Sequence, residues 1–143
     1  MSAEDLIVTS RRFLSIGLPL LAGFMAGSAL ARAQAPAKIP PAPSGFELGG
    51  DPERGKAVYA KSCAVCHGAA GDGKGKVAET MNPRPTDFQD ARYMARRSDW
   101  ELYLAVRDGG KAVGLSSKMF AWKGLIPDQS IHDAVAYIRT LAR

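Results

Sequence analysis

Two cysteines and a histidine stand within five residues of one another, in the run Cys63-Ala64-Val65-Cys66-His67. No other cysteine occurs among the 143 residues of the chain. Because residues three positions apart face the same side of a helical turn, both sulfurs can reach one group beside that turn. The imidazole of His67 follows directly and adds a nitrogen donor. The fold must therefore leave space beside this pentapeptide.

The segments on either side of this motif predict short helices and no strands. Asp51 and Pro52 form a helix start, with an N-cap acceptor followed by a residue whose missing N–H costs nothing there. Ser98 and Glu101 form a capping box, and Pro127 opens a segment with apolar residues at the i, i+3, i+4 spacing of one buried face. We expect main helices at 52–62, over about ten residues from 98 and from 127 onward, short turns at 77–81 and 90–94, and a loop at 68–76.

These predicted helices leave the core incomplete. An all-α domain of residues 51–143 with three short helices, joined by connections rich in Gly and Pro, buries little apolar surface by itself. Yet 46% of the residues are hydrophobic and 23% are charged, which excludes a disordered chain and a multi-span membrane protein. A domain of this kind needs a bound group to complete its core.

The C-x-x-C-H spacing is the attachment signature of c-type haem, and three other uses of these residues explain less. A thioredoxin-like redox pair accompanies a βαβ unit, and no strand is predicted. A structural zinc ion needs a fourth ligand, and His132 stands alone far along the chain. A plain disulfide would leave His67 and the small core unexplained. We therefore expect one covalent haem c, attached through Cys63 and Cys66, with His67 as a ligand of its iron.

The second axial ligand separates an electron carrier from a haem enzyme. Methionine is the ligand typical of a carrier, and Met81 and Met94 lie in apolar turns where a methionine usually belongs to the core. Met119 lies in an irregular stretch before the last helix, where a loop can present its sulfur to a metal, and we expect it to be the ligand. The alternatives are Met81, an open site, and His132, which we expect to face solvent beside the apolar stripe of the last helix.

Five segments carry a family resemblance: residues 63–67, 71–75, 82–88, 109–122 and 137–141. Together they resemble a bacterial class I, mono-haem c-type cytochrome over nearly all of the predicted domain. The resemblance implies the class I cytochrome c fold, with three main helices and short turns wrapped around one covalently bound haem. It also implies one-electron transfer rather than catalysis, by a free shuttle or by the cytochrome subunit of an oxidoreductase complex. A haem enzyme or sensor with an open sixth position is the alternative.

The resemblance further implies roles for individual residues. In the family, the helix before the cysteines crosses the last helix, with a glycine and an aromatic at the contact. The residues that match this contact are Gly55, Tyr59 and Tyr137. A proline carbonyl accepts the second N–H of His67, which fixes the ring, and we expect Pro85 to supply it, with Pro83 second. The family commonly has proline after the axial methionine, whereas Phe120 follows Met119 in this chain.

Residues 1–33 are typical of an export signal. Two arginines precede an apolar run over residues 13–30, and Ala31 and Ala33 provide a small-residue cleavage site. We expect the signal to be removed and the mature protein to be periplasmic. If the signal were retained, the protein would be anchored to the membrane and face the periplasm.

Residues 34–50 differ in composition from what precedes and follows them. They contain four prolines and three glycines and show almost no apolar periodicity. Such a segment is predicted to be a flexible tether, stiffened by its prolines, that leads into the domain of residues 51–143.

The charge of the chain bears on its partners. Its 19 Lys and Arg against 14 Asp and Glu give a formal net charge of +5, too low a density for binding nucleic acid. The loops that we expect to border the haem, residues 68–76 and 111–123, carry five lysines and only one acid, Asp72. We therefore expect redox partner proteins, an electron donor and an acceptor, with an acidic docking surface.

Overall fold

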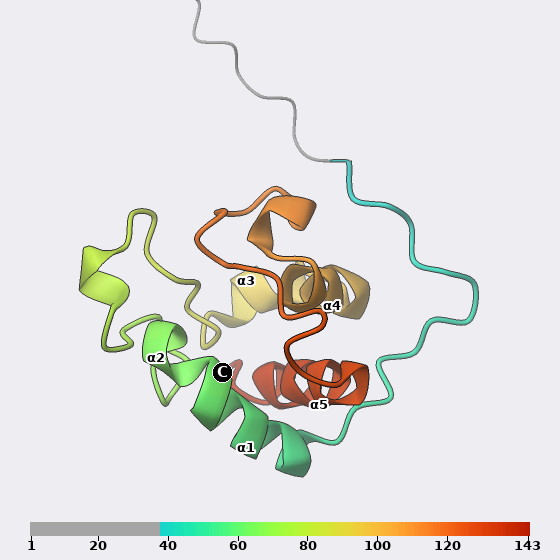
Figure 1. The fold of residues 1–143 in the computed structure, drawn as a ribbon, viewed down its shortest axis with the longest axis horizontal. Coiled ribbons are helices and arrows are strands. Elements are labelled where there is room, and N and C mark those ends of the chain that lie inside the picture. Colours follow the sequence, from blue (N-terminus) through green and yellow to red (C-terminus); the bar gives the residue numbers. More distant parts are fainter. Residues whose placement is uncertain (1–37) are drawn as a thin grey trace, which may run out of the picture. The chain divides into compact units, whose positions relative to one another are not determined.

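Helices and loops make up the whole of residues 38–143, the part of the chain that the computed structural model describes (Figure 1). The elements in chain order are α1 (Pro52–Ser62), α2 (Ala64–His67), η1 (Ala78–Thr80), α3 (Ala91–Ala95), α4 (Asp99–Arg107), η2 (Gly110–Val113) and α5 (Asp128–Arg139). No strand occurs in these described residues, apart from one isolated bridge between Lys123 and Ile126. The all-α fold expected from the sequence is confirmed.

Residues 1–33, predicted to be an export signal, lie outside the described residues. From residue 38 to the end of the chain, no helix combines the length and the apolar character that crossing a membrane requires.

The helix boundaries follow from the local signals. The Asp51 carboxylate accepts hydrogen bonds from the backbone N–H groups of Glu53 (2.8 Å) and Arg54 (3.3 Å), and α1 ends at the predicted residue. At the start of α4, Ser98 and Glu101 each bond the other's backbone N–H, so the predicted capping box is present. These caps satisfy N–H groups that have no partner within the helix.

The crossing of α1 and α5 is the largest contact between helices, and it forms one side of the core. Gly55 makes it possible, because a Cβ there would lie 1.9 Å from the carbonyl oxygen of Asp133. Tyr59 is 1% exposed, its ring centroid lies 5.2 Å from that of Tyr137, and its hydroxyl donates to the Gly68 carbonyl (2.8 Å). The predicted contact roles of Gly55, Tyr59 and Tyr137 are confirmed.

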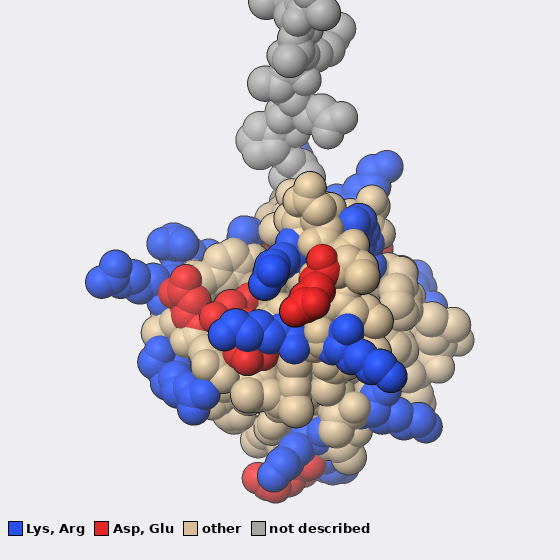
Figure 2. All heavy atoms as spheres, turned by 90° about the vertical axis from the view of Figure 1, so that its left-hand side faces the viewer, with Lys and Arg blue, Asp and Glu red and all other residues tan. Residues whose placement is uncertain are grey.

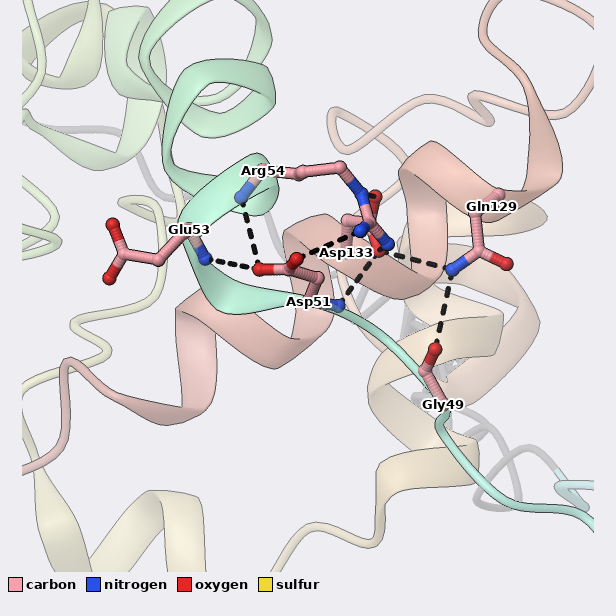
Figure 3. Close-up of polar contacts among 6 residues, drawn as sticks. All are labelled: Gly49, Asp51, Glu53, Arg54, Gln129 and Asp133. Carbon is pink, nitrogen blue, oxygen red and sulfur yellow. Dashed lines mark hydrogen bonds and ion pairs between the residues drawn. The ribbon is translucent and has the colours of Figure 1, made fainter.

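A buried carboxylate that the sequence analysis did not single out joins the two helices (Figure 3). Asp133 is 3% exposed and accepts hydrogen bonds from Arg54 Nε (2.8 Å), Arg54 Nη2 (2.9 Å), the Asp51 N–H (2.8 Å) and Gln129 Nε2 (3.1 Å). The bond from Arg54 is the main cause that lowers the pKa of Asp133 to about 2. The network therefore ties the start of α1 to the middle of α5.

Asp133→Asn should destabilise the folded protein, because the amide NH2 would face donors in place of an acceptor. Since the Arg54 side chain is 59% exposed, solvent screening limits the expected loss to about 1–2 kcal/mol at pH 7. The folded-state pKa of about 2 lies below the roughly 3.9 of an unfolded aspartate, so this stabilisation is complete above about pH 4 and disappears as the pH falls toward 2.

Denaturant unfolding of the holo-protein at pH 7 and at pH 2.5 measures this difference. Glu53→Gln is the matched control, because it likewise replaces a carboxylate by an amide, in the first turn of α1. Equal stability of Asp133→Asn and Glu53→Gln at pH 7 would contradict the assigned role of Asp133.

The predicted tether covers residues 34–50, of which 34–37 lie outside the described residues. For residues 38–50 the prediction of a flexible segment is corrected, because this part packs on the domain. The ring of Phe46 lies 4.8 Å from Trp100 and 5.6 Å from Tyr103, measured between centroids. Trp100 Nε1 donates to the Pro40 carbonyl (2.8 Å), and Leu48 packs against the core. The prolines exclude a helix here, but a few spaced apolar side chains are enough to dock an extended segment.

The environment of His132 also differs from the prediction that its side chain faces solvent. Its side chain is 18% exposed rather than solvated, and its ring packs 4.6 Å from Tyr103 and 6.1 Å from Phe46. Its Nδ1 is hydrogen-bonded to the Leu48 carbonyl. His132 therefore belongs to the contact between residues 38–50 and α5.

Candidate functional site

The C-x-x-C-H motif forms its own short helix, α2, directly after α1. Cys63 ends α1 and precedes α2, and it is 8% exposed, whereas Cys66 is half-buried. Both thiols are free. Burial, and to a lesser extent the neighbouring Cys66, raises the pKa of the Cys63 thiol to about 12, so this thiol is protonated.

The glycine-rich loop after α2 folds back across it. The N–H of Gly73 donates to the His67 carbonyl (2.9 Å), that of Gly75 to Cys66 (3.1 Å) and that of Val77 to Val65 (3.2 Å). These bonds satisfy carbonyls at the C-terminal end of α2, which have no partner within the helix. The predicted loop is confirmed, and it holds the motif in one orientation.

His67 is oriented by two contacts. Its Nδ1 lies 3.0 Å from the Thr86 carbonyl oxygen, and its ring stacks on Phe88 with centroids 4.5 Å apart. A carbonyl only accepts, so Nδ1 carries the proton and Nε2 keeps a free lone pair. Burial lowers the pKa of His67, and the bond to Thr86 opposes this in part. The lowered pKa favours the neutral form of the imidazole, which is the form that binds metals.

The predicted role of Pro85 as the acceptor for His67 is corrected. Thr86, the next residue, supplies the carbonyl. The Pro85 carbonyl faces another way, since a Cβ on Gly73 would lie 2.7 Å from its oxygen. Pro85 and Pro83 instead line the cavity beside His67.

That cavity has a volume of about 280 Å³ and mostly apolar walls. It brings together three of the predicted site residues from the end of α1 and from α2, namely Cys63, Cys66 and His67, with Met119 from the loop before α5. Those two regions are green and orange in Figure 1, so the cavity joins segments that are far apart in the sequence. The other lining residues include Met81, Leu102, Val106, Phe120 and Trp122.

The lining of this cavity shows which of the remaining candidates for the second axial ligand are near His67. Met94 is 2% exposed, belongs to the core cluster and does not line the cavity. His132 is equally absent from the lining, since it packs beside residues 38–50. Met81 lines the cavity together with Met119, so these two sulfurs are the available soft donors.

The cavity fits haem c by the chemistry of its lining. It offers two free thiols for covalent attachment, one neutral imidazole with a free nitrogen, and thioether sulfurs among apolar walls. Its charged lining residues are both basic, Arg84 and Lys118, which suits a macrocycle that bears carboxylates. No cluster of three or more His, Cys, Asp or Glu side chains that could hold a bare metal ion occurs in residues 38–143.

The surface around α2 carries mixed charge with an excess of basic groups. Figure 2 shows Lys and Arg side chains spread over this face, with fewer Asp and Glu between them. The five lysines of the two predicted border loops are all exposed: Lys74, Lys76, Lys111, Lys118 and Lys123. Exposed apolar side chains also occur there, with Phe120 53% exposed and Leu115 36% exposed.

Comparison with known proteins agrees with this geometry. The sequence profile of the Cytochrome c family matches residues 52–142. The solved structure of the KustC0563 c-type cytochrome is similar in fold, with a TM-score of 0.52 and 21% identity, covering 62% of this chain and 98% of that one. A search of curated protein sequences finds no match.

A second solved structure has a different context. It is a chain of the Kuenenia stuttgartiensis reducing HAO-like protein complex Kustc0457/Kustc0458, with a TM-score of 0.50 and 27% identity. The similarity covers 63% of this chain and 42% of that one, so this chain corresponds to less than half of that protein's length.

Proposed function

Because this chain belongs to the cytochrome c family, we propose that it is a periplasmic carrier of single electrons whose haem c iron is bound by His67 and Met119. Covalent haem c and electron transport are properties of the family as a whole. The axial ligand pair, the periplasmic location and the nature of the partners are specific to the proposal. The proposed periplasmic location of the protein rests on the export signal expected at residues 1–33.

One observation supports the ligand assignment: Met119, carried by the loop before α5, lines the same cavity as the two thiols and an imidazole whose Nδ1 is already engaged. Met81 also lines this cavity, but it stands close in the chain to Thr86 and Phe88, which hold His67. Haem c, when bound, supplies the one-electron couple between ferric and ferrous iron. Thr86 keeps His67 in the tautomer that leaves Nε2 free, and Phe88 keeps its ring from turning. When haem c is bound, a Met119 sulfur held by its iron would leave no open site for a substrate and would favour the reduced form.

The spectrum of the purified holo-protein tests this proposal. We expect a low-spin oxidised spectrum with a charge-transfer band from methionine sulfur to iron, and slow binding of carbon monoxide and cyanide. A high-spin spectrum with rapid binding of either ligand would instead support a haem enzyme or sensor with an open sixth position.

The partner surface is proposed to be acidic, whether the protein is a free shuttle or the cytochrome subunit of an oxidoreductase. The similarity to part of a chain in a multi-protein complex is compatible with the second role. Support for an acidic partner comes from the five exposed lysines of the loops at 68–76 and 111–123, which are accompanied only by Asp72. Complementary charge of this kind mainly accelerates encounter.

Small inorganic oxidants can test this charge without a known partner. Oxidation of the reduced protein by anionic hexacyanoferrate(III) should slow several-fold between 10 mM and about 150 mM salt, because screening weakens attraction to the lysines. Oxidation by cationic tris(phenanthroline)cobalt(III) should accelerate over the same range. Lys118→Glu should reduce both salt effects more than the same change at Lys56 on α1, whereas salt-independent rates would point to docking through Leu115 and Phe120.

A further inference from the structure

The loop that carries Met119 is attached to the rest of the fold by backbone hydrogen bonds at that residue and after it. The N–H of Gly110 donates to the Met119 carbonyl (2.9 Å), and that of Trp122 donates to Val106 (3.0 Å). The N–H of Lys123 donates to Arg107 (2.9 Å). Val106 and Arg107 stand in the last turn of α4, where carbonyls have no partner within the helix. The end of α4 therefore holds the loop after Met119.

Gly109 and Gly110 lie against the backbone of the same loop. Gly109 has a φ of +88°, and a Cβ on it would lie 3.0 Å from the Met119 carbonyl oxygen and 3.2 Å from the Ala121 nitrogen. A Cβ on Gly110 would lie 2.4 Å from the Ser116 carbonyl oxygen and 3.1 Å from the Met119 Cβ. Contact at the Cβ of Met119 matters most, because a shift there moves the sulfur with it.

We propose that Gly109 and Gly110 are positioning residues, which set how far the Met119 sulfur reaches into the cavity by letting the loop lie directly on their backbone. The inference rests on the proposed ligation of iron by Met119. An axial bond tolerates only a displacement of about 0.5 Å or less in the supporting structure. Phe120 stands where a proline would stiffen the loop, and it is 53% exposed, so the restraint on Met119 must come from its other contacts.

Gly109→Ala and Gly110→Ala test the proposal, with Gly124→Ala as the matched control. Gly124 lies in the same loop and also has a positive φ, +82°, but a Cβ there meets no atom within 4 Å. Gly109→Ala and Gly124→Ala therefore impose similar backbone strain, and only the first crowds the Met119 segment. Gly110→Ala adds stronger crowding at an ordinary φ.

We expect both variants at 109 and 110 to weaken the methionine-to-iron charge-transfer band and to lower the reduction potential. Imidazole and carbon monoxide should bind about tenfold more tightly, because their apparent affinity rises with the fraction of protein whose iron is open. Gly124→Ala should lose stability in denaturant but keep the band, the potential and the ligand affinity of the wild-type protein.

The possible outcomes are distinct. Variants at 109 and 110 that match Gly124→Ala in band and ligand affinity would overturn the positioning role alone. A Met119→Ala protein with a wild-type spectrum would overturn the proposed ligation, and this inference with it. If Gly110→Ala does not fold, Gly109→Ala still decides, because its closest new contact is longer, at 3.0 Å.

Discussion

Met119→Ala should leave haem c attached to Cys63 and Cys66 and open one axial position of the iron. The attachment residues lie at the end of α1 and on α2, whereas Met119 reaches the cavity from the loop before α5, so the change leaves the attachment intact. Without the sulfur, the charge-transfer band should disappear, and carbon monoxide and cyanide should bind readily. The reduction potential should fall by on the order of 0.1 V, a modest part of the roughly 0.8 V range that axial ligands span.

Two other methionines provide controls for this result. Met94→Ala should destabilise the core without changing the spectrum, because Met94 is 2% exposed and does not line the cavity. Met81→Ala is the sharper comparison, because Met81 does line it. If Met81→Ala lost the charge-transfer band and had a lower reduction potential, while Met119→Ala kept the wild-type band and potential, the ligand assignment would transfer to Met81.

Replacing both Cys63 and Cys66 with serine should abolish holo-protein and, with it, the stable fold. The haem is the missing part of the core, and a void of about 280 Å³ costs at most about 7 kcal/mol at the known cost per unit volume of core cavities. That amount is comparable with the whole stability of a small domain, about 5–15 kcal/mol. Single replacements should lower the yield of holo-protein sharply.

Haem staining after denaturing electrophoresis measures attachment, and far-ultraviolet circular dichroism measures the fold. Val65→Thr is a matched control, because Val65 stands between the two cysteines but is 47% exposed. It should retain both signals. A double serine variant that kept helical circular dichroism and unfolded cooperatively without haem would show that the protein core is sufficient by itself.

The features that could be predicted from the sequence depend on residues close together in the chain. The spacing of Cys63, Cys66 and His67 lies within one turn, and the caps at Asp51 and Ser98 act on N–H groups two or three residues away. Such signals are read from a short window, because the atoms involved are joined by few rotatable bonds. For the same reason α1 begins and ends at the predicted residues.

Other features required the tertiary structure, because they join residues far apart in the chain. The choice between Pro85 and Thr86 depends on the path of a loop that returns to His67 after 19 residues, and one peptide unit changes which carbonyl faces the ring. Asp133 meets Arg54 across 79 residues.

The sequence by itself determined the haem attachment motif, the all-α class and the boundaries of α1, through contacts within one or two turns. Only the tertiary structure decided that residues 38–50 pack on α4 and α5, that Met94 lies away from the cavity, and that the Met119 loop rests on two glycines. Composition marks residues 38–50 as extended, but only the positions of Trp100 and Tyr103 give Phe46 a surface to bury. Complementary surfaces of this kind exist only once distant segments have met.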